Sequence, residues 1–258
     1  MNTLEKHTRQ VRDAGRKLLV PYATGGLTAD WTDYLSAAVD AGADVVEVGL
    51  PFSDPMLDGP AIQRASDAAL ARGATVDGIL ADVSRLALPV PVVAMTYANL
   101  VFRRGAEWFC GALRDAGFSG LIVPDVPLDE VDELSAAAAG LDLVLLVSPA
   151  TTAERRREIA RRSGGYVYAV SLMGTTGARE TLPESAAELA RSVKAVTDLP
   201  VLLGFGVSSP ATARAAVAEA DGVIVGSALM QQVLDGASPG DVGVRLAGLR
   251  TVLDAPDE

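Results

Sequence analysis

Eight short apolar runs recur along the sequence, and longer segments with helical spacing separate them. Their continuous apolar character is typical of parallel strands that are buried on both faces. Eight strand–helix units in 258 residues predict an α/β fold, a single (β/α)₈ TIM barrel over residues 1–258 with an extra N-terminal helix. The predicted strands cover residues 17–23, 43–50, 90–97, 119–125, 141–147, 165–170, 200–206 and 221–227.

The helical segments between these runs are amphipathic, and several end at a glycine that fits a helix C-cap. The helical segments include WTDYLSAAVDAG, GAEWFCGALRDAG and TTAERRREIARRSG, which end at a glycine, and PATARAAVAEA, which does not.

Composition excludes several classes of protein. The chain is 49% hydrophobic but has no apolar run long enough to span a bilayer, and its polar start has no apolar core of an export signal, so we expect a soluble cytoplasmic protein. The single cysteine, Cys110, rules out an internal disulfide and suits a reducing cytosol. A formal net charge of -11 argues against a broad nucleic-acid or acidic-membrane surface, although a local anion site is compatible with it.

Two carboxylates fall where a barrel carries its chemistry, at the C-terminal end of the second predicted strand and in the loop after it. Glu47 lies among valines and Asp58 follows eleven residues later. Two carboxyl groups in unlike environments can divide the roles of acid and base. The alternative is structural: Glu47 forms a salt bridge and Asp58 caps the helix that begins PAIQ.

A glycine-rich loop follows each of the last three predicted strands, with the sequences MGTTGARE, GFGVSSP and VGSALM. Loops at the seventh and eighth strands of such barrels commonly hold phosphate through backbone N–H groups. We therefore expect Gly177, Gly206, Gly226 and Ser227 to line a phosphate site, although each glycine alone also fits an ordinary turn.

Other nucleophiles and metal ligands are scarce. None of the three lysines, Lys6, Lys17 and Lys194, falls at the C-terminal end of a predicted strand, which argues against a Schiff base. The only histidine, His7, lies in the N-terminal segment and is expected to be solvated, which argues against a histidine-ligated metal and a Ser-His triad. We interpret Cys110 as a packed helix residue. With these chemistries set aside, the reaction that the sequence favours is proton transfer by carboxylates on a phosphorylated small molecule.

A series of motifs follows in order across nearly the whole chain: VEVGLPFSDPMLDGP, MTYANLVF, IVPDVP, GYVYAVSLMGTTGAR, GFGVSSP and VIVGSALM. Together these motifs resemble the tryptophan synthase α subunit family. The loop PFSDP…DGP is the most specific of them, because the GFG and GS elements also occur in other phosphate-binding barrels.

The resemblance implies cleavage of indole-3-glycerol phosphate to indole and glyceraldehyde 3-phosphate. In that reaction Glu47 would be the acid and base that protonates indole C3 and handles the side-chain hydroxyl, and Asp58 would hold the indole N–H. By the same resemblance, further residues would shape or position the site: Tyr22, Tyr97, Asp125, Tyr168 and Thr176, the last helping to place Asp58.

The resemblance also implies the phosphate site on the four glycine-loop residues, and a partner. Pro51 and Asp54 would lie on the loop that faces a β subunit, a pyridoxal-phosphate enzyme, in an α2β2 assembly. This chain itself would need no cofactor and no metal. After the first strand, ATGGLT stands where the family commonly has a Gly-Asp-Pro type of turn.

Two alternatives stay open at this point. One is a free-standing indole-3-glycerol-phosphate lyase that releases indole without a partner. The other is a non-catalytic subunit that only activates the β enzyme, and the presence of both Glu47 and Asp58 speaks against it.

Overall fold

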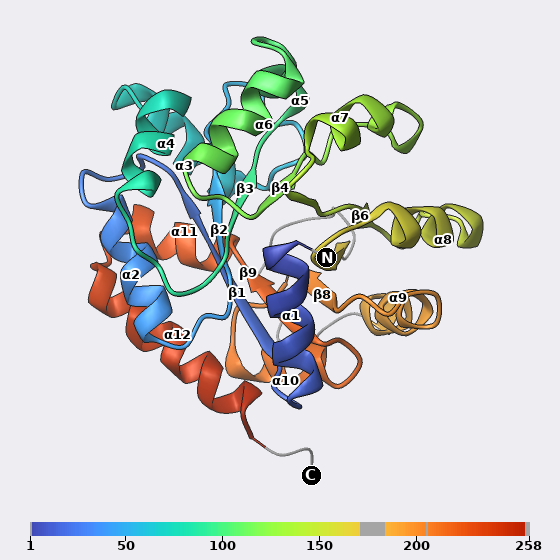
Figure 1. The fold of residues 1–258 in the computed structure, drawn as a ribbon. Helices are drawn as coiled ribbons and strands as arrows, with labels where there is room; N and C mark the ends of the chain where they lie inside the picture. The colour runs from blue at the N-terminus through green and yellow to red at the C-terminus, as the bar shows by residue number, and fades with distance from the viewer. Residues whose placement is uncertain (1, 171–183, 205, 256–258) are drawn as a thin grey trace.

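The computed structural model describes residues 2–170, 184–204 and 206–255. Within these residues, parallel strands alternate with helices as the sequence predicted (Figure 1). The strands are β1 (Leu18–Thr24), β2 (Val46–Gly49), β3 (Val92–Met95), β4 (Gly120–Ile122), β5 (Asp142–Leu143), β6 (Leu146–Val147), β7 (Val167–Val170), β8 (Val201–Gly204) and β9 (Gly222–Val225).

The strands form one parallel sheet in the order β5-β4-β3-β2-β1-β9-β8-β7-β6. The predicted fifth strand is present as two short pieces, β5 and β6, which together close the barrel. On the β4 side of residues 142–147, the N–H of Val144 donates to the carbonyl of Leu121 at 2.9 Å. On the β7 side, the N–H of Tyr168 donates to the carbonyl of Leu145 at 3.1 Å. The eight predicted strands and the barrel are therefore confirmed.

The helices cover the outside of the barrel (Figure 1). Several begin at a Ser or Thr whose side chain accepts a hydrogen bond from the first turn, which satisfies an otherwise unpaired N–H. The helices of the described residues are α1 (Thr3–Asp13), α2 (Trp31–Asp40), α3 (Pro60–Ala71), α4 (Val76–Ser84), α5 (Ala98–Phe102), α6 (Ala106–Asp115), α7 (Val131–Ala137), α8 (Ala153–Arg162), α9 (Glu184–Lys194), α10 (Pro210–Val217), α11 (Ser227–Leu234) and α12 (Pro239–Leu253), with a 3₁₀ helix at Leu128–Glu130.

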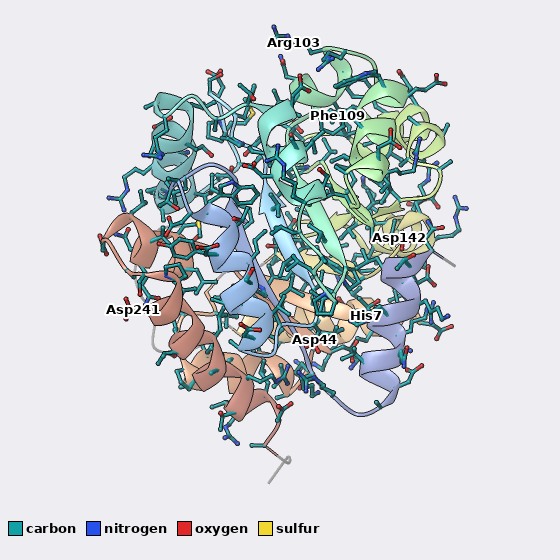
Figure 2. All side chains as sticks on the ribbon, turned by 60° about the vertical axis from the view of Figure 1, so that its left-hand side comes forward. His7, Asp44, Arg103, Phe109, Asp142 and Asp241 are labelled. Carbon is teal, nitrogen blue, oxygen red and sulfur yellow. The ribbon has the colours of Figure 1, made fainter. Side chains whose placement is uncertain are left out.

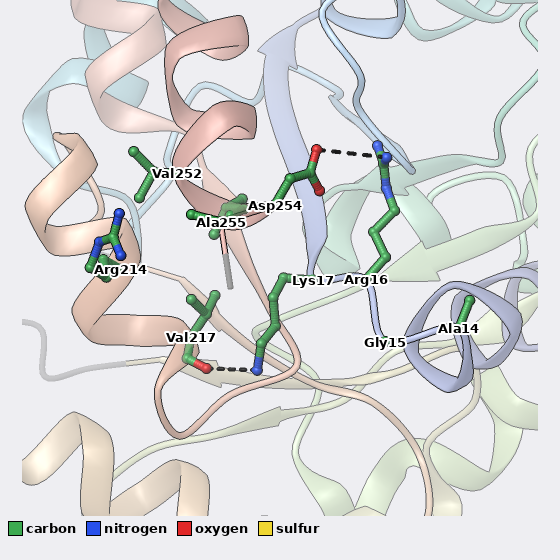
Figure 3. A pocket seen from close by; sticks show the side chains of 10 residues that line it. Ala14, Gly15, Arg16, Lys17, Arg214, Val217, Val252, Asp254 and Ala255 are labelled. Carbon is green, nitrogen blue, oxygen red and sulfur yellow. Dashed lines mark hydrogen bonds and ion pairs between the residues drawn. The ribbon is translucent and has the colours of Figure 1, made fainter. Parts of the chain in front are cut away.

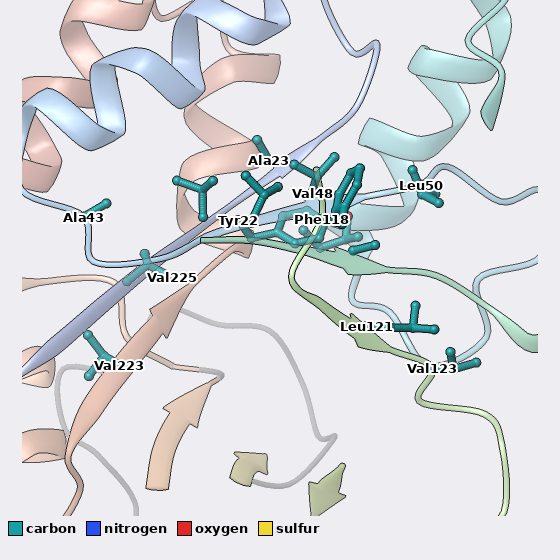
Figure 4. Packing of buried hydrophobic residues seen from close by; sticks show 14 of the residues in the cluster. Tyr22, Ala23, Ala43, Val48, Leu50, Phe118, Leu121, Val123, Val223 and Val225 are labelled. Atoms are coloured by element: carbon teal, nitrogen blue, oxygen red, sulfur yellow. The ribbon is translucent and has the colours of Figure 1, made fainter. Parts of the chain in front are cut away.

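Buried side chains form two layers, because successive residues of a strand point to opposite faces. Leu18 and Val20 of β1 belong to the cluster inside the barrel, whereas Leu19 between them belongs to the cluster between the sheet and the helices. Figure 4 shows part of this outer cluster, which includes Val48, Leu50 and Phe118. Burial of each such side chain stabilises the fold by about 1.5–3 kcal/mol.

The N-terminal helix closes the barrel at the N-terminal ends of the strands. Leu4 is fully buried in the inner cluster, and the hydroxyl of Thr8 donates to the carbonyl of Gly165 at 2.6 Å. The expectation that His7 is solvated is wrong: its side chain is half-buried, and Nε2 lies 2.8 Å from the carbonyl oxygen of Asp44 (Figure 2). The helix lies across the barrel end instead of projecting into water, which explains the difference.

Lys17, Lys194 and Cys110 lie in or next to the elements that the sequence predicted for them. Lys17 precedes β1, and its Nζ donates to the carbonyl of Val217 at 2.8 Å. Lys194 ends α9 and its Nζ lies 2.7 Å from an Asp221 carboxylate oxygen, while Cys110 is buried in α6. None of the described helices has the length and apolar character needed to cross a membrane.

Candidate active site

Glu47 points into the barrel from β2. Its neighbours Val46 and Val48 pack in the outer cluster, so the alternation of the strand directs Glu47 inward. It pairs in register with Tyr22 of β1 and Val93 of β3, and only 1% of its surface is exposed. The strand thus holds a carboxyl group inside an apolar barrel.

This carboxyl group has no charged partner within the described part of the chain. Its Oε2 atom is buried and has no hydrogen-bond partner there, and no ion pair includes it. Burial, and then the negative charge of Asp58, raise the pKa of Glu47 from 4.5 to about 8. The salt-bridge interpretation therefore does not hold for these residues, and Glu47 can carry a proton near neutral pH.

Asp58 lies just before α3, in a loop whose backbone is held by hydrogen bonds. Its N–H donates to the carbonyl of Pro55 at 3.0 Å, and the side chain of Gln63 donates to its carbonyl at 2.9 Å. The cap residue of α3 is Gly59, with Pro60 in the first turn and no capping hydrogen bond from a side chain. The interpretation of Asp58 as the helix cap is wrong, and its carboxyl group is left for other contacts.

The Asp58 carboxyl group is also desolvated. Burial raises its pKa from 3.8 to about 6, and a contact with the Tyr97 hydroxyl partly offsets the rise. Because its charge acts on Glu47, the two carboxyl groups belong to one site. One group is mostly protonated near neutral pH and the other mostly ionised, which is the division that acid–base catalysis requires.

Tyr97 joins the Asp58 loop to the end of β3. Its hydroxyl accepts a hydrogen bond from the N–H of Leu57 at 3.1 Å. Its ring stacks on Phe52 at the other end of the loop, with 5.3 Å between the ring centroids. Phe52 was not predicted from the sequence, where a single aromatic residue in a loop carries no signal of its contact.

Two tyrosines are held against glycines of neighbouring strands. A Cβ atom on Gly49 would lie 1.8 Å from the Tyr22 hydroxyl oxygen, and one on Gly204 would lie 2.2 Å from the Tyr168 ring. Burial raises the pKa of both tyrosines, and the charge of Glu47 adds to the rise. The structure thus brings the predicted Tyr22 and Tyr168 to Glu47. Glycine inside a strand marks such a close approach, a signal that the sequence analysis did not use.

Tyr166 is a further inward-facing residue that sequence reasoning missed. It is fully buried, its hydroxyl has no hydrogen-bond partner within the described residues, and its pKa is raised by burial and by the charge of Glu47. Tyr166 and Tyr168 are two positions apart, and this spacing in a strand places both side chains on one face.

Asp125 makes a structural contact at the same end of the barrel. Its carboxylate accepts a hydrogen bond from the N–H of Ala98 at 2.8 Å, in the first turn of α5. A carboxylate at a helix N-terminus stabilises the helix, so this residue shapes the wall that carries Tyr97.

The predicted phosphate residues lie partly within the described chain. Gly226 is the cap residue of α11 and Ser227 begins that helix, where the first N–H groups have no partner inside the helix. Gly206 follows β8, the strand next to β9, with a φ of 85°. Thr176 and Gly177 lie outside the described residues. The described part is thus a helix N-terminus beside a glycine turn.

The loop that carries Asp58 presents two different surfaces. Pro51 is buried by this chain, whereas Asp54 is exposed and Met56 is 77% exposed. Among the residues that the structure describes, no group of three or more His, Cys, Asp or Glu side chains is arranged to hold a metal ion.

The family model described as tryptophan synthase alpha chain matches residues 8–245. The tryptophan synthase alpha chain of Picosynechococcus is 42% identical over 243 residues, 92% of each chain. This chain belongs to the tryptophan synthase α chain family. Another member, from Carboxydothermus hydrogenoformans, is 44% identical over 85% of each chain.

Solved structures agree with the family assignment. A Mycobacterium tuberculosis tryptophan synthase chain has a TM-score of 0.91 at 38% identity and covers 99% of both chains. The tryptophan synthase subunit alpha of Legionella pneumophila has a TM-score of 0.90 at 34% identity, with coverage of 98% and 99%. Tryptophan synthase α chains cleave indole-3-glycerol phosphate, so the chain is a carbon–carbon lyase of tryptophan biosynthesis.

The unusual first loop of this α chain is accommodated by its two glycines. The N–H of Gly25 donates to the carbonyl of Gly49 at 2.9 Å, and a Cβ on Gly25 would lie 2.8 Å from Ile79 of α4. Gly26 has a φ of 74°, and a Cβ there would lie 2.7 Å from Ala74. The sequence ATGGLT therefore packs this loop closely against the start of α4.

Proposed function

We propose that Glu47 is the acid and base of the lyase reaction and that Asp58 stabilises the charge that develops on the indole ring. Glu47 donates its proton to indole C3, and Asp58 holds the indole N–H as the ring becomes positive. Glu47 then accepts the proton of the side-chain hydroxyl while the carbon–carbon bond breaks. Indole and glyceraldehyde 3-phosphate leave, and Glu47 has regained its proton.

The observation that carries this proposal is the pair of carboxyl groups with different pKa values at one end of the barrel. Glu47, with a pKa of about 8, is mostly protonated at neutral pH. Asp58, with a pKa of about 6, is mostly ionised there. The electron sink is the protonated indole itself, so this step requires neither a lysine imine nor a metal.

The remaining predicted residues take binding roles in this proposal. Tyr22 and Tyr168 pack beside Glu47 and shape the indole site, with Tyr97 and Asp125 forming the wall near Asp58. Thr176 helps to place Asp58. The substrate phosphate binds Gly177, Gly206, Gly226 and Ser227, and the backbone N–H groups at the start of α11 support that position.

The proposal extends to a partner. A tryptophan synthase β subunit, which carries the pyridoxal phosphate, binds the exposed part of loop 51–59, including Asp54, in an α2β2 assembly, and this chain holds no cofactor. The chain acts as one barrel domain over residues 1–258 in the cytoplasm, where its single cysteine stays reduced.

The test is indole release from indole-3-glycerol phosphate by the purified chain, with and without a β subunit. Glu47→Gln is nearly isosteric but cannot transfer the proton, so we expect a loss of at least about 10²-fold. Glu107→Gln, the same substitution at an exposed glutamate of α6, controls for the change itself. Activity of Glu47→Gln within a few-fold of the unaltered chain would remove Glu47 from the mechanism. A fast isolated chain that no β subunit accelerates would favour the free-standing lyase.

A further inference from the structure

A cavity of about 280 Å³ opens at the N-terminal end of the barrel, opposite to Glu47 and Asp58. Three separate parts of the chain line it: residues 14–17 between α1 and β1, Arg214 and Val217 of α10, and residues 252–255 at the end of α12 (Figure 3). Its volume is enough for a small ligand but below that of most drug-sized sites.

The described side chains that line this cavity carry a net positive charge, opposite in sign to the net charge of the chain. Arg16, Lys17 and Arg214 line the cavity, and among the described lining residues Asp254 supplies the one carboxylate. The chain as a whole carries a formal net charge of -11. A local excess of positive charge on such a chain favours an anion at this place.

The carboxylates near the cavity are already paired. Asp254 lies 2.6 Å from a guanidinium nitrogen of Arg250 and 3.9 Å from one of Arg16, and Arg16 also pairs with Asp44 at 3.0 Å (Figure 3 shows the Arg16–Asp254 contact). These contacts account for Arg16 and Asp254. They leave Lys17 and Arg214 as the cations to be explained.

Lys17 and Arg214 have no carboxylate within ion-pair distance in the described part of the chain. The ammonium of Lys17 donates to the carbonyls of Val217 at 2.8 Å and Ala220 at 3.2 Å. These two bonds satisfy carbonyls at the end of α10 and use two of the three ammonium donors, so one donor remains. Arg214 is exposed, and within residues 2–170, 184–204 and 206–255 its planar guanidinium has no hydrogen-bond partner.

We propose that this cavity binds the phosphate group of a small anion between Lys17 and Arg214. The guanidinium of Arg214 matches two phosphate oxygens, and Lys17 supplies a point charge and a further donor. A bound phosphate links the α1–β1 connection to α10, and it therefore stabilises the folded chain by mass action. This site is separate from the substrate phosphate site and does not depend on it.

Hydrogen exchange with and without inorganic phosphate, at constant ionic strength set by chloride, locates the binding. We expect phosphate to slow exchange in residues 14–17 and 252–255 of the unaltered chain. Isothermal calorimetry on the same samples gives the affinity. Because Arg214→Gln removes the charge and the paired donors of the guanidinium, it should raise the Kd of this site by roughly 10-fold or more.

Arg157→Gln, which alters an exposed arginine of α8 remote from the cavity, is the matched control and should keep the protection. Arg214→Gln should leave indole formation unchanged. The same protection by glycerol 3-phosphate would identify a phosphate-ester site, whereas protection by inorganic phosphate alone would identify a free-anion site, and both support the proposal. It is overturned if Arg214→Gln binds phosphate as the unaltered chain does, or if no exchange slows at residues 14–17 and 252–255.

Discussion

The hydroxyl of Tyr97 accepts a hydrogen bond from the N–H of Leu57, 3.1 Å away, and this bond joins the Asp58 loop to the end of β3. The same tyrosine stacks on Phe52, so it contacts the loop near both of its ends. Its hydroxyl also lowers the pKa of Asp58. The position and the charge of the Asp58 carboxylate therefore depend on a residue of another strand.

Removal of the Tyr97 hydroxyl should slow catalysis without loss of the fold. Tyr97→Phe keeps the stacked ring but leaves the N–H of Leu57 without its acceptor, which costs about 1–3 kcal/mol if the group stays buried. We expect kcat for indole formation to fall roughly 10-fold or more, and the acidic limb of its pH profile to move to higher pH as the pKa of Asp58 rises. Steady-state kinetics between pH 5 and 9 measure both effects.

Tyr34→Phe is the matched control for this variant. The Tyr34 hydroxyl donates to the carbonyl of Ala237 at 2.8 Å, away from the barrel mouth, so its loss should affect stability but not the pH profile. Equal profiles for Tyr97→Phe and the unaltered chain would show that Tyr97 does not position Asp58.

The buried Glu47 should make the stability of the chain depend on pH. Its pKa is about 8 in the folded chain against an ordinary 4.5, so between these values the folded state binds more protons than the unfolded state. The free energy of unfolding then falls as the pH rises through this window. Glu47→Gln has no such proton. Its free energy of unfolding relative to that of the unaltered chain should therefore be higher at pH 8.5 than at pH 4.5, by roughly 2–5 kcal/mol.

Urea unfolding of both chains at several pH values from 4.5 to 8.5 measures this difference. Asp58→Asn provides a second series, because the pKa of Asp58, about 6 against 3.8, places its own effect at lower pH. A constant difference between Glu47→Gln and the unaltered chain across the window would mean that the pKa of Glu47 is not raised.

A side chain at Gly49 should displace Tyr22 from its place beside Glu47. The Cβ of Gly49→Ala would lie 1.8 Å from the Tyr22 hydroxyl, and such overpacking costs about 1–3 kcal/mol. We expect activity to fall at least about 10-fold, measured as kcat/KM. Gly248→Ala on α12, where a Cβ meets nothing within 4 Å, should instead stabilise the chain by about 0.4–1 kcal/mol. Similar results for both variants would contradict this role of Gly49.

The barrel could be predicted from the sequence because its signals are local and repeated. Each of the eight apolar runs contains a strand, although the observed strands are shorter, as in Val92–Met95 within the predicted 90–97. Glycine caps are confirmed after α2 and α6, where Gly42 and Gly117 have φ values of 92° and 90°. The break between β5 and β6 has no sequence signal, since the run LDLVLLV is continuously apolar.

The candidate site could be predicted only in part. Glu47 stands out because a carboxylate inside an apolar strand is costly, and the family motif then assigned it a role. The stacking of Phe52 on Tyr97, and the packing of Tyr22 on Gly49, depend on residues that the barrel brings together from different strands and loops. Such contacts follow from the closed geometry and leave no periodic pattern in the sequence.

A negative charge at the start of α11 should separate stability from phosphate binding. Ser227→Asp places a carboxylate at the helix N-terminus, where it stabilises the helix by about 0.3–1 kcal/mol but repels a phosphate bound to the same N–H groups. We expect a higher KM for indole-3-glycerol phosphate and an unchanged or higher Tm. The neutral Ser227→Asn is the control. An unaltered KM in Ser227→Asp would move the substrate phosphate away from α11.

A charge on the exposed part of loop 51–59 should weaken activation by a β subunit. Met56 is 77% exposed in this chain. An apolar side chain that a partner buries costs about 1 kcal/mol or more when it is an anchor of the interface and a charge replaces it. We expect Met56→Asp to need at least about 5-fold more β subunit for half-maximal stimulation of indole formation. Titration of the β subunit into the purified chain measures this concentration.

Val244→Asp is the matched control, since Val244 of α12 is 76% exposed and lies away from the loop. It should leave the titration curve unchanged. Because partner binding and loop closure favour each other, Met56→Asp should weaken the stimulation more than the basal rate of the isolated chain. Coincident titration curves for Met56→Asp, Val244→Asp and the unaltered chain would place the partner surface outside this loop, and would leave the buried Pro51 and the exposed Asp54 without a part in it.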